Sequence, residues 1–255
     1  MSDAIKPTLE EIISTLEHSS LATVIVEGNE DIIIYRNLEK NLIGIDVLPV
    51  YGRKTVLDIF EEKQSNPKLK NKKIAFIADK DVWCNIGIPN KFTDSSLIFT
   101  TGYSLENDVF VDYNCQNIIN NNENKSEFDL NKLKFIQWYA LALQATLNNI
   151  DERQLSTSAS AVHSDRKLSK HPNEVLNNFQ NLSELKSNET FPQLLEEQLI
   201  SEFPLTIRGK SLMALFVKSC SNHKTLGIFE SVAERPGHYI DKIFEQVTVY
   251  FKNIN

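Results

Sequence analysis

The chain has 255 residues, of which 41% are hydrophobic and 24% charged, so it can bury the core of one large domain or two small ones. Its formal net charge of −7 argues against a protein that coats nucleic acid through phosphate contacts alone, because such proteins are usually basic. No apolar run approaches the ~18 residues of a membrane span, and residues 1–10 lack the pattern of a signal peptide. The three cysteines form no Cys-x-x-Cys pair, which favours a reducing cytoplasm over disulfides or a zinc site.

The first half of the chain predicts strands that alternate with helices. Apolar residues at helical spacing predict helices, and short β-branched runs predict buried strands. The expected elements are a helix over 8–18, a strand over 21–26, a helix over 31–42, a strand over 45–51, a helix over 55–64, a lysine-rich loop, a strand over 74–78 and a strand over 97–100. This alternation predicts an α/β fold with a mostly parallel sheet flanked by helices, in which the carboxyl ends of the strands share one edge.

The second half predicts a helical part. Residues 117–131 are rich in Asn and Glu and predict a loop, whereas 133–148 are apolar nearly all round and predict a buried helix. Trp138 and Tyr139 on that helix are expected in the core. Residues 151–190 are polar with weak helical periodicity, and further helices are expected over 191–203, 210–219 and 238–251.

Acidic residues follow two of the predicted strands. Glu27 follows the first and precedes Gly28, and Asp79 and Asp81 follow the third. Because parallel strands end at one edge, these carboxylates are expected near one another. Three hard oxygen donors suit Mg²⁺ or Mn²⁺, which keep water ligands and accept substrate phosphate. The pattern therefore predicts metal-assisted phosphodiester cleavage.

Other interpretations of the same residues stay open. Glu27 could cap the helix that begins near Asn29, and Glu106 could cap the helix that it opens. Asp79 and Asp81 could belong to an ordinary loop or to a glycosyltransferase Asp-x-Asp motif. A haloacid-dehalogenase motif is disfavoured, because Trp83 stands where that motif needs Thr or Val.

For several basic residues and histidines, the sequence gives weaker evidence of a functional role. Arg53 and Lys54 follow a strand end and could contact substrate phosphate, or could be surface charges. The lysines between residues 63 and 73 are read as a solvated linker, with a nucleic-acid contact as the alternative. His163 and His171 lack metal-ligand spacing, and neither is taken as a ligand.

The order of the motifs resembles the Toprim domain of topoisomerases, primases and overcoming-lysogenization-defect nucleases. That pattern is a strand-end Glu-Gly, here Glu27-Gly28, followed by Asp-x-Asp after a later strand, here Asp79-Lys80-Asp81. Further motifs are Val26-Glu27-Gly28-Asn29-Glu30-Asp31 with Tyr35, Ser104-Leu105-Glu106-Asn107 and Ile207-Arg208-Gly209-Lys210. Together, over residues 20–220, they look like the stand-alone Toprim nucleases encoded beside ABC-type ATPases, among them the effector subunits of PARIS anti-phage systems.

The resemblance implies more than the residues do alone. It implies a Toprim-like catalytic domain over 1–115 and a helical domain over 116–255 that packs on it and serves substrate access, dimerisation or partner docking. It implies that Glu106 is a further metal or water ligand and that Lys210 steadies the transition state. It also implies tRNA as the substrate and a separate ABC-type ATPase that holds the nuclease until phage proteins release it.

Three functions from different classes follow. The first is the toxic nuclease effector, which acts on tRNA or another RNA, or on DNA. The second is a non-catalytic Toprim-fold module that binds an ATPase, and the third is a nucleotide-sugar transferase that uses Asp79 and Asp81. The chain has no Walker A run, so an ATPase must be a separate protein.

Overall fold

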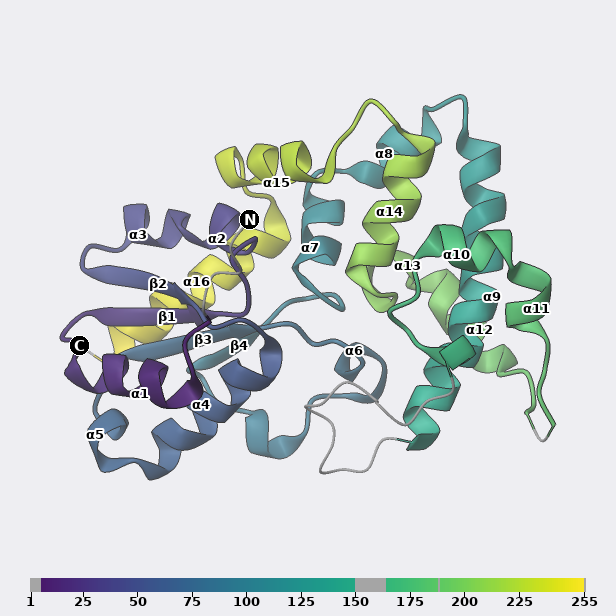
Figure 1. The fold of residues 1–255 in the computed structure, drawn as a ribbon. Helices are drawn as coiled ribbons and strands as arrows, with labels where there is room; N and C mark the ends of the chain where they lie inside the picture. Colours follow the sequence, from purple (N-terminus) through teal and green to yellow (C-terminus); the bar gives the residue numbers. More distant parts are fainter. Residues whose placement is uncertain (1–5, 150–163, 188, 255) are drawn as a thin grey trace. The chain divides into compact units, whose positions relative to one another are not determined.

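A computed structural model describes residues 6–149, 164–187 and 189–254 (Figure 1). The chain forms two compact units. The first comprises Met1–Asp79, Ile88–Thr100 and Phe229–Asn255, and the second comprises Lys80–Gly87 and Thr101–Ile228. The expected domains 1–115 and 116–255 stay a prediction, and these compact units have other bounds.

The first unit contains a four-stranded, all-parallel sheet. The strands are β1 (Ala22–Val26), β2 (Ile45–Pro49), β3 (Ile74–Ala78) and β4 (Leu97–Phe99), in the order β2-β1-β3-β4. Val24 of β1 lies opposite Val47 on one side and Ala75 on the other. Every residue of β3 is buried, as is typical of a parallel strand covered by helices on both faces. The predicted α/β fold with a parallel sheet is confirmed.

Helices cover both faces of this sheet (Figure 1). They are α1 (Leu9–His18), α2 (Ile32–Tyr35), α3 (Asn37–Asn41), α4 (Arg53–Ser65), α5 (Pro67–Lys70) and α16 (His238–Asn253), with the 3-10 turn η1 (Asn90–Phe92). Phe60 of α4 packs edge-on against Phe76 of β3 at 5.6 Å, and Tyr35 of α2 meets Phe244 of α16 at 6.5 Å between ring centres. The single helix predicted over 31–42 is instead two short helices, α2 and α3, divided at Arg36.

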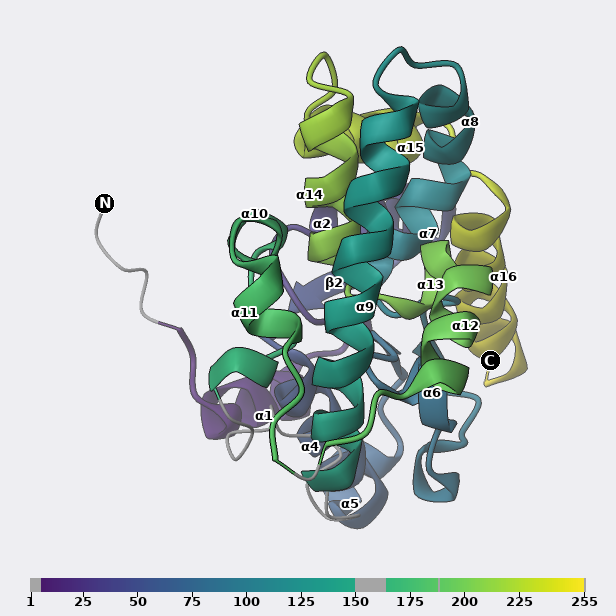
Figure 2. The ribbon, with the colours of Figure 1, turned by 90° about the vertical axis from the view of Figure 1, so that its right-hand side faces the viewer.

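The second unit is helical in its described residues. Its elements are α6 (Trp83–Ile86), α7 (Leu105–Asp112), α8 (Cys115–Asn120), α9 (Lys125–Asn149), η2 (Ser164–Arg166), α10 (Pro172–Asn177), α11 (Phe179–Ser183), α12 (Gln193–Ser201), α13 (Phe203–Thr206) and α14 (Gly209–Ser219). Helix α9 is the longest element of this unit, and α12 and α14 lie beside it (Figure 2). Trp138 and Tyr139 on α9 are fully buried, so their predicted place in the core is confirmed.

The loop predicted over 117–131 is wrong. Helix α8 occupies its start, and α9 begins at Lys125 because Phe128 is fully buried and anchors the first turns of that helix. Helix α15 (Thr225–Glu234) was not predicted. His163 and residues 150–162 lie outside the described residues. Within the described residues, no helix combines the length and apolar character that a membrane span requires.

Candidate functional site

Glu27 and Asp79 lie together at the carboxyl edge of the sheet in the first unit. They follow β1 and β3, which are neighbouring strands. The backbone N–H of Asp79 donates a hydrogen bond of 2.7 Å to Oε1 of Glu27. The Glu27 side chain is therefore held against the end of β3, which places two acidic residues at one point of the edge. This proximity was expected from the sequence.

Glu27 lies beside the turn that leads from β1 into α2. Asp31 occupies the N-cap position of α2, and its carboxylate accepts the N–H of Gly28 at 2.8 Å. The backbone oxygen of Glu27 accepts the N–H of Gly52 at 2.8 Å. Asp31 thus closes the turn after β1 and leaves the Glu27 carboxylate directed toward β3. This role of Asp31 was not predicted from the sequence.

Arg53 and Lys54 open α4 beside this edge, directly after Gly52. Gly52 has a φ of +134°, a conformation that L residues rarely adopt, and it lets the chain turn from the edge into the helix. The Arg53 side chain is buried, whereas Lys54 is exposed and pairs with Asp58 at 2.5 Å. Both predicted phosphate ligands therefore lie at the start of α4, and their role stays a prediction.

The donor set of the first unit suits a magnesium ion. Mg²⁺ is commonly held by one or two carboxylates, with water and substrate phosphate completing its shell. Glu27 and Asp79 supply two carboxylates of this kind, so these residues fit such an ion. Among the described residues, no three His, Cys, Asp or Glu side chains gather closely enough to form a fuller metal cluster.

Asp81 lies in the second unit, where its backbone is held in an unusual conformation. Its φ is +48°, which is uncommon for a residue other than Gly and marks a position fixed by its surroundings. The Asp81 N–H donates to the Tyr103 oxygen at 2.7 Å, and the Lys80 ammonium donates to the Thr101 oxygen at 2.8 Å. The backbone of Asp81, the second aspartate of the motif, is thus held by a hydrogen bond against the segment that leads into α7.

Two further motifs of the second unit lie side by side. Ser104 precedes α7, and its hydroxyl donates to a Glu106 oxygen at 2.5 Å. A Cβ placed on Gly209 would stand 2.1 Å from the Ser104 Oγ and 2.8 Å from the Glu106 Cβ. The segment that carries Lys210 therefore packs directly on the segment that carries Glu106, and this contact requires a glycine.

Asn107 ties these two motifs together. Its Oδ1 accepts the N–H of Ser104 at 2.9 Å, and its amide donates to the oxygens of Pro204 at 2.8 Å and Ile207 at 3.0 Å. The residue is fully buried. The sequence signal for this role was the polar residue three positions after Ser104, which is the spacing of a capping box.

An Asn107→Asp replacement is expected to destabilise the protein by about 2–3 kcal/mol. Aspartate still accepts from Ser104, but it cannot donate to the two carbonyl oxygens and adds a buried charge. Denaturant unfolding measures the effect. Asn120→Asp is the control, because Asn120 is exposed and only accepts a bond from Gln116, so it should change stability by less than about 0.5 kcal/mol. Equal stabilities of the two variants would contradict the role of Asn107.

Asp108 fastens the loop that precedes α7. Its two carboxylate oxygens accept the N–H groups of Thr101 and Gly102, both at 2.8 Å. Burial raises the pKa of Asp108 from 3.8 to about 6, although the two N–H bonds act in the opposite direction. The Asp108 carboxyl group therefore binds its proton more tightly in the folded chain than in the unfolded chain.

The pKa of Asp108 predicts a pH dependence of stability. Its folded value lies above its unfolded value, so its contribution to the free energy of unfolding falls as pH rises from about 4 to about 6, by at most about 3 kcal/mol. Urea unfolding of the wild type and Asp108→Asn at several pH values measures this contribution. The stability of the wild type relative to the variant should decline across this window; a constant difference would show that Asp108 does not titrate there.

Two tyrosines and a cysteine near Asp81 are held neutral. Burial raises the pKa of Tyr103 and Tyr139 well above 10, and raises the pKa of the Cys84 thiol to about 12. The Tyr139 hydroxyl accepts the N–H of Arg208 at 3.1 Å. Cys84 is therefore unsuited to act as a thiolate nucleophile.

No family model matches the chain, and a comparison with curated proteins also gives no match. The structure shows an α/β unit whose four parallel strands are ordered β2-β1-β3-β4 and flanked by helices, followed by a mainly helical part. This arrangement is consistent with a Toprim fold and does not by itself prove one.

Proposed function

We propose that the protein is a Mg²⁺-dependent nuclease of the Toprim class. The observation that carries this proposal is the pair Glu27 and Asp79, which lies at the carboxyl edge of a parallel sheet and is fixed by the 2.7 Å bond between them. Open α/β sheets place their reactive groups at this edge. A buried arginine, Arg53, opens the neighbouring helix and supplies positive charge for a phosphate.

The candidate site residues of the first unit have distinct roles in the proposed reaction. Glu27 and Asp79 hold Mg²⁺ or Mn²⁺, and Glu27 alternatively accepts the proton of the attacking water. The bound ion supplies Lewis-acid polarisation of the phosphate. Arg53 orients the phosphodiester, with Lys54 as a weaker candidate. In the second unit, Asp81 and Glu106 are proposed as further ligands and Lys210 as a group that stabilises charge on the phosphate.

The motif resemblance supports a narrower form of the proposal. In that form the protein is the toxic effector of an anti-phage defence system in the cytoplasm, and it cleaves tRNA when a separate ABC-type ATPase releases it, which leads to abortive infection. The helical part serves partner docking or formation of a homodimer. DNA is the alternative substrate.

A second candidate is a non-catalytic module that binds the ATPase. The observation that favours it is that, among the described residues, no three His, Cys, Asp or Glu side chains lie close enough together to hold a metal ion. Under this alternative, Glu27 and Asp79 serve only to fix the end of β3. The two candidates differ in whether the isolated chain cleaves any nucleic acid.

Metal removal distinguishes these functions. The purified full chain is incubated with total tRNA and with plasmid DNA, and the products are separated on gels. We expect discrete cleavage products with Mg²⁺ or Mn²⁺, loss of cleavage after chelation with EDTA, and recovery when Mg²⁺ is restored. The gel that shows the product identifies the substrate. Cleavage that persists in EDTA would exclude the metal mechanism, and a chain that cuts neither substrate but binds an ATPase would support the module.

A further inference from the structure

Arg208 directly precedes α14, two residues before Lys210, and its backbone is held from two other helices of the second unit. Its N–H donates to the Tyr139 hydroxyl of α9 at 3.1 Å. The oxygen of the preceding residue, Ile207, accepts the side-chain amide of Asn107 in α7 at 3.0 Å. Tyr139 and Asn107 are both fully buried. The base of the Arg208 side chain is therefore fixed, as a residue that must meet a ligand in one geometry requires.

The Arg208 side chain is partly buried, and its charge is not matched within the described part of the chain. Among the residues that the structure describes, no Asp or Glu forms an ion pair with it, although the chain has 34 acidic and 27 basic residues. Arg166, a fully buried arginine of the same unit, is paired with Glu189 at 2.7 Å. A partly desolvated charge without a counter-ion costs free energy. An anion from outside the chain would offset this cost at Arg208.

Two tyrosines lie near Arg208, and neither neutralises it. Burial raises the pKa of Tyr103 and of Tyr139 well above 10, and the positive charge of Arg208 acts in the opposite direction, so both hydroxyls stay uncharged. The negative charge of Asp81 acts on the same two hydroxyls and therefore lies in the same region. A proposed metal ligand and an unmatched arginine thus lie around one pair of tyrosines.

A phosphodiester is the anion that this arginine suits best. The guanidinium is planar and always charged, and it can donate two parallel N–H groups to the oxygens of one phosphate. A phosphate that accepts these bonds beside Asp81 would lie next to the proposed metal ligand, where the substrate backbone is expected.

We propose that Arg208 binds a backbone phosphate of the nucleic acid on which the protein acts. Arg208 thus adds to the second unit a phosphate contact that is separate from Lys210. This inference rests on the proposed function, from which the nucleic-acid ligand is taken. The ligand chemistry, a phosphodiester, is common to tRNA and DNA.

Binding that is measured apart from cleavage tests this role. The full chain is titrated into end-labelled tRNA, and in a second series into end-labelled duplex DNA, and fluorescence anisotropy is recorded at several salt concentrations. The buffer contains Ca²⁺, which takes oxygen ligands as Mg²⁺ does. The nucleic acid that binds more tightly to the wild type is the source of the phosphate.

Arg208→Gln should weaken binding of that nucleic acid about tenfold, because a charge-assisted contact is lost. The slope of log affinity against log salt concentration should fall by about one, since one fewer phosphate is neutralised. Arg208→Lys keeps the charge, so it should keep this slope and lose affinity only a few-fold, through loss of the two-bond geometry. A merely structural role of Arg208 would not change the salt slope.

The matched control is Arg235→Gln, which makes the same substitution at an exposed arginine that follows α15. It should leave the affinity within about twofold of the wild type and the salt slope unchanged. The thermal midpoint of Arg208→Gln should stay within about 2 °C of the wild type, because no described ion pair is lost.

The inference is overturned if Arg208→Gln binds both nucleic acids as tightly as Arg235→Gln, if its salt slope equals that of the wild type, or if the wild type binds neither. Cleavage by the same proteins in Mg²⁺ separates this result from the proposed function. A wild type that binds through Arg208 without cleaving would overturn the nuclease and leave this inference standing. Cleavage by the wild type, with unchanged binding by Arg208→Gln, would overturn this inference alone.

Discussion

Replacement of Glu27 by glutamine is expected to lower the rate of nucleic-acid cleavage by about a thousandfold and to leave the fold intact. Loss of a metal-binding carboxylate removes several kcal/mol of transition-state stabilisation, and about 1.4 kcal/mol corresponds to a tenfold change in rate. Glutamine retains a side-chain oxygen, so it can still accept the Asp79 N–H that Glu27 accepts at 2.7 Å. The variant therefore separates the charge of Glu27 from its hydrogen bond.

The measurement is the single-turnover rate of cleavage of tRNA or DNA, together with the thermal midpoint of unfolding. Glu61→Gln is the control, since Glu61 is an exposed carboxylate of the same unit whose only described role is a surface pair with Lys91 at 2.7 Å. Exposed pairs contribute little to stability, and this variant should cleave at the wild-type rate. If Glu27→Gln cleaves within a few-fold of the wild type, Glu27 is not part of the catalytic site.

The acidic pair could be predicted because it depends on local pattern and on a general rule of topology. The runs that become β1 and β3 are short, apolar and rich in β-branched residues, and each ends at an acidic residue. Right-handed crossovers then bring both strand ends to one edge. The structure adds the side-chain contact between Glu27 and Asp79, which the sequence pattern cannot specify.

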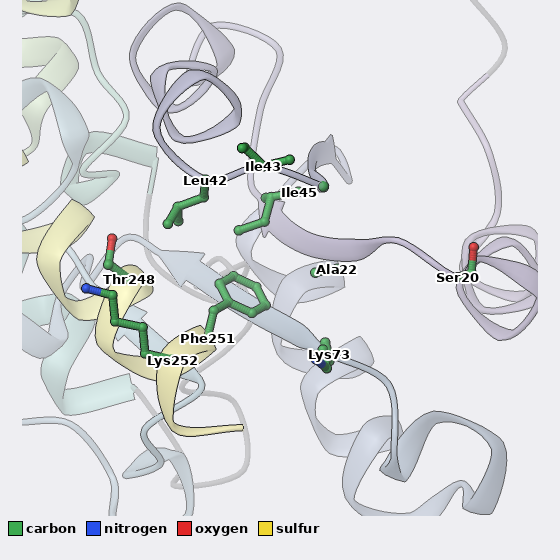
Figure 3. Close-up of a pocket in the computed structure, with 10 residues that line it drawn as sticks. Ser20, Ala22, Leu42, Ile43, Ile45, Lys73, Thr248, Phe251 and Lys252 are labelled. Atoms are coloured by element: carbon green, nitrogen blue, oxygen red, sulfur yellow. The ribbon is translucent and has the colours of Figure 1, made fainter. Parts of the chain in front are cut away.

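The chain returns to the sheet in a way that local pattern could not reveal. The helix predicted over 238–251 is present as α16, yet nothing in its periodicity shows that it packs on β3 and β4, whose residues precede it by more than 130 positions. The apolar residues of its buried face, such as Phe244 and Val247, indicate only that the helix is amphipathic. Long-range packing decides where an amphipathic helix docks, and here it places Phe251 of α16 opposite Leu42 and Ile45 (Figure 3).

The missed helices have a related cause. Asn and Glu are frequent between residues 117 and 131, and Asn favours turns and caps, so this composition predicted a loop. Burial of Cys115, Ile119 and Phe128 in the second unit outweighs this preference and fixes helices α8 and α9. Tertiary burial thus overrides a compositional signal that, taken alone, indicates irregular structure.

The close contact between Gly209 and the start of α7 predicts a large effect on stability. Gly209→Ala should destabilise the protein by about 2–3 kcal/mol, because the added Cβ would stand 2.1 Å from the Ser104 Oγ and 2.6 Å from the Asn107 Oδ1. These atoms belong to a buried hydrogen-bonded segment and cannot withdraw without breaking the bonds of Asn107. Helix preference acts in the opposite direction, since alanine favours a helix over glycine by about 1 kcal/mol.

Gly227→Ala separates the clash from the helix preference. Gly227 also lies in a helix, α15, but a Cβ added there meets no atom within 4 Å. This variant should gain up to about 1 kcal/mol from the same preference. Thermal unfolding should then show a midpoint several degrees below the wild type for Gly209→Ala and at or above it for Gly227→Ala. If both variants unfold at or above the wild-type midpoint, the segment that carries Lys210 is not tightly packed on Ser104–Asn107, and Glu106 and Lys210 lose the structural basis for acting together.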